Sequence, residues 1–256
     1  WQADPKKWRR SAEAGVEQRV TEFVLRSVPT LSLDRQASDA EGFAQALGES
    51  FETFGFAVIS DHGVDPALIA RTWDLTRAFF ALPVETKRAY VLPGLGGARG
   101  YTPFGIEIAK DADTHDLKEF WHVGRDLPPG HRYRDQMPDN IWPKEVPGFR
   151  ETLQAIFAAF DVAGNKILSG IARYLGLAPD WFDPAVRDGN SVLRLLHYPP
   201  IPRHADGIRA GAHEDINLIT LFFPAKWMTE AYLLIILIKT GLGAAAFALF
   251  AYLQLK

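Results

Sequence analysis

Residues 211–221 read Gly-Ala-His-Glu-Asp-Ile-Asn-Leu-Ile-Thr-Leu, which is the most specific chemical pattern in the chain. His213 and Asp215 are separated by one residue in a strand-like run, so we expect their side chains on the same face. An imidazole and a carboxylate placed in this way are two of the three protein ligands of the 2-His-1-carboxylate site that binds non-haem iron. Because H-x-D pairs also occur on solvated strands, the pair gains meaning only from the segments around it.

The composition is that of a globular protein, with 47% of the 256 residues hydrophobic and 23% charged. The net charge of −3 and the lack of a long basic run give no reason to expect nucleic acid as a partner. The chain has no cysteine, which excludes disulfides, thiolate metal sites and a cysteine nucleophile, and suits a reducing compartment such as the cytoplasm.

Local patterns predict helices first and strands later along the chain. A capping box of Ser38 and Glu41 begins a helix that ends at Gly55, and Asp65 before a proline begins another. The longest helical pattern is at residues 149–175. Strands are predicted at residues 56–60, 118–123 and 191–198, and an extended region at 208–223. This order indicates an α+β fold.

Six ordered segments resemble a known family. They are FGFAVISDHGVDPALI (54–69), FFALPVETK (79–87), RGYTPFGIEIAK (99–110), DLKEFWHVGRDLP (116–128), LRLLHYPP (193–200) and GIRAGAHEDINLITL (207–221). Together they resemble the isopenicillin N synthase-like branch of the 2-oxoglutarate- and Fe(II)-dependent dioxygenases, in its bacterial members. The resemblance covers residues 29–221.

This resemblance implies an α+β fold with a mainly β core, a double-stranded β-helix (jelly roll), behind a helical N-terminal region. The domain division it implies is an extension at 1–28, a dioxygenase N-terminal region at 29–148 and the first part of the jelly roll at 149–221. Residues 222–256 form an apolar tail that resembles no part of that fold.

The resemblance also implies the site and the reaction. His213 and Asp215 would bind Fe(II), and Tyr198 would hydrogen-bond a carboxylate of the cosubstrate 2-oxoglutarate. Arg194, on the same strand face as Tyr198, is a second cofactor-binding candidate, with a structural ion pair as the alternative. The expected activity is oxidation of a small molecule by dioxygen, coupled to decarboxylation of 2-oxoglutarate to succinate. An ethylene- and succinate-forming variant of this chemistry is included in the expectation.

The pattern is incomplete towards the end of the chain. The family has a second iron-binding histidine and an Arg-x-Ser after the H-x-D, whereas the last histidine here is His213 and the last arginine is Arg209. We therefore expect the activity of this chain to be impaired. The alternatives are a catalytically dead, truncated or frame-shifted remnant and a membrane-tethered binding module.

The apolar tail suggests the membrane alternative. A helix over residues 231–253 would be long enough to cross the roughly 30 Å core of a bilayer, and its leucine, isoleucine and phenylalanine side chains outweigh one lysine. The expectation is therefore an apolar C-terminal helix, with membrane contact through 231–253 if the tail inserts. A buried helix or strand of a globular core is the alternative.

Overall fold

The computed structural model describes residues 28–108, 115–200, 217–223 and 234–238, the last of these by their backbone alone. The described elements follow in the order β1 (Thr30–Ser32), α2 (Arg35–Ser38), α3 (Ala40–Phe54), β2 (Phe56–Ser60), α4 (Pro66–Phe80), α5 (Val84–Arg88), β3 (Gly100–Thr102), β4 (Glu119–Gly124), α6 (Phe149–Tyr174), α7 (Asp183–Val186), β5 (Val192–His197), β6 (Ile219–Phe222) and β7 (Leu234–Ile238).

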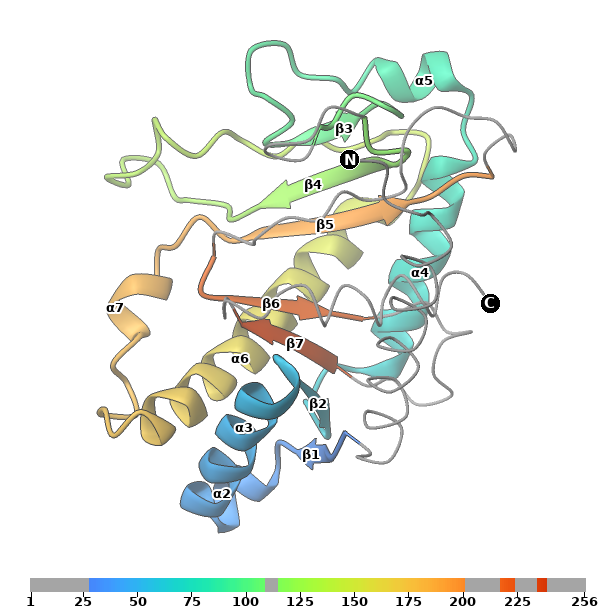
Figure 1. Cartoon of the computed structure of the whole chain (residues 1–256). Coiled ribbons are helices and arrows are strands. Elements are labelled where there is room, and N and C mark those ends of the chain that lie inside the picture. Colours follow the sequence, from blue (N-terminus) through green and yellow to red (C-terminus); the bar gives the residue numbers. More distant parts are fainter. Residues whose placement is uncertain (1–27, 109–114, 201–216, 224–233, 239–256) are drawn as a thin grey trace, which may run out of the picture.

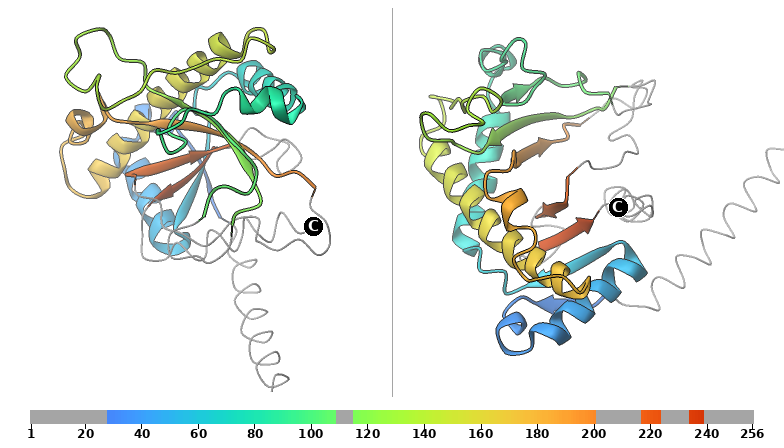
Figure 2. Two further views of the ribbon diagram at one scale, coloured as in Figure 1. Left: turned by 90° about the horizontal axis from the view of Figure 1, so that it is seen from above. Right: turned by 90° about the vertical axis from the view of Figure 1, so that its left-hand side faces the viewer.

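The strands form two small sheets. One sheet has the order β1-β2-β7-β6, in which only β1 and β2 are parallel, and the other is the antiparallel sheet β3-β4-β5. The strands follow one another from top to bottom in Figure 1, and the right-hand view of Figure 2 shows α6 and α4 on one side of them. Helices and strands are thus combined as the α+β prediction expects. The jelly-roll core is represented in the described residues by these two sheets.

The predicted helix starts are confirmed with one correction. In α4, the side chain of Asp65 accepts a hydrogen bond from Ala67 N, with Pro66 in the first turn, as predicted. In α3, the capping side chain is Asp39, which accepts from Gly42 N at 2.9 Å, and the prediction of Ser38 is wrong. Ser38 cannot cap α3 because it is the last residue of α2, where its hydroxyl donates to Arg35 O.

The long helix α6 forms the spine of the fold. Its apolar face is buried against α3 and α4, where Leu153, Ile156 and Ile167 are almost fully inaccessible. Of the helices in the described part of the chain, α6 alone is long and apolar enough to cross a membrane. Its buried face shows what the apolar residues do in this structure: they fill the core between the helices and the sheets.

The centre of the core is aromatic and lies between β4 and the helices. Trp121 on β4 is fully buried, with ring centroids 4.8 Å from Phe79 of α4 and 5.4 Å from Phe149 of α6, both edge-on. Because side chains alternate along a strand, Glu119 and Val123 share this helix-facing side with Trp121. Phe120 and His122 then lie on the opposite side of the sheet.

The prediction of a C-terminal helix is wrong where the tail is described. Leu234–Ile238 is the strand β7, which pairs antiparallel with β2 on one side and with β6 on the other. By composition, a run of leucine and isoleucine fits a helix or a strand equally well. Here it forms a strand because the backbone N–H and C=O groups at the edges of β2 and β6 pair with it. The rest of the proposed membrane segment 231–253 lies outside the described residues.

Candidate functional site

The antiparallel pair β4–β5 brings the described site candidates together. Its register places His122 directly opposite Arg194 and Glu119 opposite His197. Because side chains alternate, Arg194 and Tyr198 lie on the sheet face of His122, away from α4 and α6, while His197 points to the helix side. The sequence prediction that Arg194 and Tyr198 share a face agrees with this register.

Arg194 is held on this face by two side chains. Its Nε donates to His122 Nε2 at 2.6 Å, and its Nη1 donates to Glu107 Oε1 at 3.3 Å. The guanidinium also lies 4.5 Å from the centre of the Phe120 ring, a cation–π distance. The structure therefore contains the ion pair that was the alternative for Arg194, and that pair lies on the site face of the sheet.

His122 is a neutral, buried link between this arginine and a loop. Its Nδ1 lies 2.6 Å from Gly97 O, a contact that requires a proton on Nδ1 and leaves Nε2 as the acceptor for Arg194. Burial, together with the charge of Arg194, lowers the pKa of His122 to about 4. The imidazole is therefore neutral, in a single tautomer, at physiological pH.

A second charged group lies beside Tyr198. Lys118 is 5% exposed, with its Nζ 2.6 Å from Glu107 Oε2 and 2.7 Å from Asp116 Oδ2. Burial lowers the pKa of Lys118, but the two carboxylates more than offset this and raise it, so that the amine stays charged. Burial also raises the pKa of Tyr198, opposed by the charge of Lys118, so the phenol keeps its proton and can donate a hydrogen bond.

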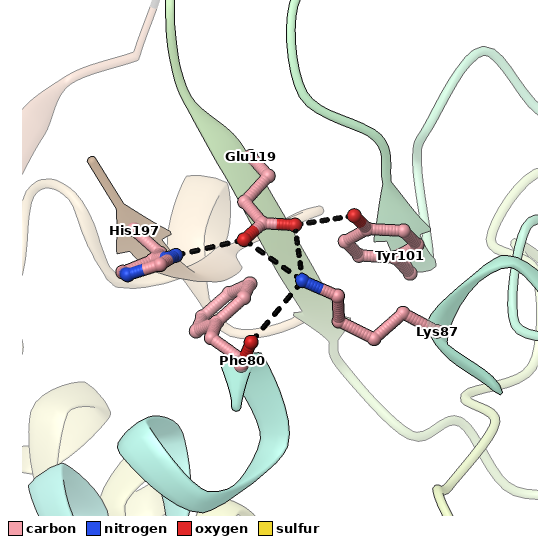
Figure 3. A network of polar contacts seen from close by, with 5 residues as sticks. All are labelled: Phe80, Lys87, Tyr101, Glu119 and His197. Carbon is pink, nitrogen blue, oxygen red and sulfur yellow. Dashed lines mark hydrogen bonds and ion pairs between the residues drawn. The ribbon is translucent and has the colours of Figure 1, made fainter. Parts of the chain in front are cut away.

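The helix side of the same strands carries a second polar network, centred on the buried Glu119 (Figure 3). Glu119 accepts from Lys87 Nζ at 2.8 and 2.9 Å, from the hydroxyl of Tyr101 and from His197 Nδ1 at 2.7 Å. Lys87 Nζ also donates to Phe80 O at 3.2 Å, and the ring of His197 stacks on that of Phe80.

This network fixes the charge of Glu119. Burial raises the pKa of Glu119, but the contacts from His197, Lys87 and Tyr101 lower it to about 2. The network joins the end of α4 and the helix α5 to all three strands of the sheet. Its last member is His197, one residue before Tyr198. Sequence reasoning missed it, although Lys87 and Glu119 lie in two of the quoted family-like segments.

The two metal-ligand candidates, His213 and Asp215, lie outside the described residues, so their predicted role stays a prediction. Within the described part of the chain no group of three or more histidine or acidic side chains is arranged to hold a metal ion. The described site therefore consists of the sheet face with Arg194, His122, Glu107, Lys118 and Tyr198.

Comparison with known proteins decides the family. Residues 28–145 match the family model for the non-haem dioxygenase in morphine synthesis N-terminal region. A putative 2OG-Fe(II) oxygenase family protein from Caulobacter crescentus, of known structure, is 50% identical to this chain. The match has a TM-score of 0.74 and covers 83% of this chain and 73% of that one. The chain belongs to the 2OG-Fe(II) oxygenase family.

Two curated proteins are similar to this chain at lower identity. The proline hydroxylase buaE of Petromyces alliaceus is 34% identical over 193 residues, which are 72% of this chain and 58% of the relative. The validamycin A dioxygenase of Streptomyces hygroscopicus subsp. limoneus is 31% identical, over 76% of this chain and 57% of the relative. The chain thus spans little more than half the length of these curated relatives.

The fold is also that of more distant solved structures. A full-length Neurospora crassa protein, solved in complex with alpha-KG, has a TM-score of 0.68 and 23% identity, over 83% of this chain and 73% of that chain. The two small sheets seen here are therefore the described part of the fold that this structure shares with the Caulobacter crescentus protein.

Proposed function

We propose that this protein acts in an Fe(II)- and 2-oxoglutarate-dependent oxygenase reaction on a small molecule. The observation that carries the proposal is the 50% identity to a 2OG-Fe(II) oxygenase family protein over 83% of this chain. The H-x-D of His213 and Asp215 supports it, since imidazole and carboxylate are the ligand types of non-haem Fe(II) sites.

Each proposed residue has one task. His213 and Asp215 would bind the metal, and Tyr198 would donate a hydrogen bond to a carboxylate of 2-oxoglutarate. The raised pKa of Tyr198 supports that task, because a protonated phenol donates to a carboxylate whereas a phenolate would repel it. The charges of Lys118 and Arg194 near the phenol favour an anion at the same place, and those of Asp116 and Glu107 oppose it.

When bound, Fe(II) supplies the chemistry that couples dioxygen reduction to decarboxylation of 2-oxoglutarate and oxidation of the substrate. The described residues supply orientation. The Glu119 network fixes the end of β5, from which Tyr198 projects to the other face.

The sequence holds no histidine after His213, so two of the three ligands of the triad are identified. We propose weakened iron binding in this chain by itself. The hypothesis of a frame-shifted or replaced segment after residue 221 is tested by reading the coding DNA beyond that codon in all three frames. A frame that encodes a later histidine and an Arg-x-Ser would support it, and the lack of one would end it.

The test of function is succinate release. The full chain is incubated anaerobically with Fe(II), ascorbate and 2-oxoglutarate, then exposed to air, and succinate and headspace ethylene are measured. We expect succinate release that needs both iron and dioxygen and falls at least about tenfold in His213→Ala and Asp215→Ala.

The matched control is His131→Ala, which removes a histidine that lies 3.5 Å from Asp188 in a loop away from the β4–β5 sheet face. This variant should match the wild type. Succinate release that is the same in all four proteins would show that the turnover is adventitious and would refute the proposal.

A further inference from the structure

The contacts of Arg194 orient its guanidinium but engage only some of its hydrogen-bond donors. It has five N–H donors, of which Nε donates to His122 and one Nη1 hydrogen to Glu107. Its side chain is 37% exposed. With respect to the described residues, three donors of a fixed cation thus remain for a group outside the sheet.

The orientation does not depend on pH in the physiological range. The Nδ1–H of His122 donates a hydrogen bond to the carbonyl oxygen of Gly97 at 2.6 Å, so Nε2 of the neutral ring can only accept, and an arginine Nε can only donate. The pairing therefore has one arrangement. The low pKa of His122 keeps it in place at any pH well above 4.

Glu107 pairs with Arg194 through a single long contact. Its carboxylate lies 3.3 Å from Arg194 and 2.6 Å from Lys118, which is also paired with Asp116 at 2.7 Å, so Arg194 has the longest of these three ion pairs. An additional anionic oxygen would complete the pairing of the guanidinium, and carboxylates are the anions whose two oxygens match its planar donors.

We assign this anion to the substrate, because Tyr198 is the residue proposed to bind the cosubstrate. Arg194 and Tyr198 are four residues apart on one strand face, which separates their Cα atoms by about 13 Å. Their side chains are close enough for the charge of Arg194 to lower the pKa of Tyr198, so a titration of Arg194→Gln with 2-oxoglutarate separates the two ligands. Phe120 and Leu196 are opposite each other between the two polar ends.

We propose that Arg194 binds the carboxylate of the primary substrate, a small organic acid with an apolar body, and that His122 is the positioning residue which orients the guanidinium. The inference rests on the proposed function and names its substrate class. The apolar body would lie along the half-buried Leu196, with its far end directed towards Tyr198 and the cosubstrate.

The experiment compares a matched acid and amide without any turnover. Binding of 3-phenylpropanoate and 3-phenylpropanamide to the full chain is measured by saturation-transfer NMR at pH 7.5. We expect the acid to bind about tenfold more tightly than the amide, a preference that Arg194→Gln removes. The control is Arg187→Gln on the exposed side of the helical segment before β5, which should keep the preference.

His122 is tested by variants and by its nitrogen signals. His122→Phe should weaken acid binding several-fold, and His122→Gln, whose amide oxygen can accept from Arg194, should restore part of it. Long-range 1H–15N spectra of the wild type should show a neutral His122 with the proton on Nδ1, and addition of the acid should shift the Nε2 signal.

The outcomes separate this inference from the proposed function. Equal binding of acid and amide to the wild type would refute the substrate class whether or not succinate is formed. If Arg194→Gln instead abolishes 2-oxoglutarate binding, measured by calorimetry, the arginine belongs to the cosubstrate and the inference is wrong, while the proposed function stands. If iron-dependent succinate release is missing but the acid preference follows Arg194, the proposed function fails and the anion site remains.

Discussion

Glu119 and His197 lie directly opposite each other on β4 and β5, and their side chains meet on the helix side of the sheet, with 2.7 Å between Glu119 Oε1 and His197 Nδ1. On the other side of the same two strands, His122 and Arg194 form the corresponding pair at 2.6 Å. Two cross-strand pairs on opposite faces therefore hold the strand that leads into Tyr198.

The first prediction concerns the buried charge of Glu119. Glu119→Gln removes the anion and leaves the ammonium of Lys87, 5% exposed, without its counter-ion. Breaking a buried pair from one side costs about 3 kcal/mol of unfolding free energy. Urea unfolding at pH 7 measures it.

Two comparisons test the cause. Arg77→Gln breaks the exposed pair with Asp74 and should change the free energy of unfolding little.

The pH dependence is the second comparison. Because the folded pKa of Glu119 is about 2, below its ordinary value, the contribution of Glu119 to the free energy of unfolding is present above about pH 4.5 and is lost as the pH falls towards 2. A Glu119→Gln variant as stable as the wild type at pH 7 would contradict the assigned role.

The second prediction concerns acid stability and His122. Its folded pKa is about 4 against an ordinary value of 6.5, so below pH 6.5 the unfolded chain binds a proton that the folded protein does not. Stability should therefore fall between pH 6.5 and 4, by about 1 to 2 kcal/mol at pH 5 relative to pH 7. His122→Phe should show a smaller fall, and identical pH profiles for the two proteins would refute the assignment.

The third prediction concerns two glycines with positive φ. Gly100 has φ +72°, and a Cβ there would lie 2.6 Å from Tyr90 O, whereas Gly94 has φ +78° and open space around it. Gly94→Ala should cost about 1 kcal/mol through backbone strain alone. Gly100→Ala should cost at least about 2 kcal/mol more because the backbone must move. Thermal unfolding of both variants measures the difference, and equal costs would show that the contact is relieved elsewhere.

The fourth prediction concerns the cosubstrate. Tyr198→Phe removes one hydrogen bond to a carboxylate and should weaken 2-oxoglutarate binding by about tenfold, with the free energy of unfolding nearly unchanged. Calorimetric titration with 2-oxoglutarate measures it. Tyr133→Phe, in the loop after β4, is the control. A Tyr198→Phe variant with wild-type affinity would remove Tyr198 from the site.

The helices could be read from the sequence because their signals are local. Asp65 before Pro66 begins α4, and the apolar period of residues 149–175 predicts α6 to within one residue, since both patterns depend on neighbours within one or two turns. The one capping error, Ser38 in place of Asp39, arose because a short helix, α2, ends immediately before α3.

The polar networks could not be predicted in the same way. Lys87 and Glu119 are 32 residues apart, and Glu119 and His197 are 78 apart, so only strand pairing brings them together. The acceptor role of His122 depends on two distant residues. Gly97 precedes it by 25 residues and lies in a loop, and Arg194 follows it by 72 residues and lies on β5.

The sequence by itself determined the family-like segments, the helices α4 and α6, and the H-x-D that predicts an iron site. The tertiary structure decided which side chains of β4 and β5 pair on each face, and it made a strand of Leu234–Ile238 where composition allowed a helix. The physical reason is the same in both cases: a helix satisfies its own backbone, whereas a strand takes its hydrogen bonds and its neighbours from distant parts of the chain.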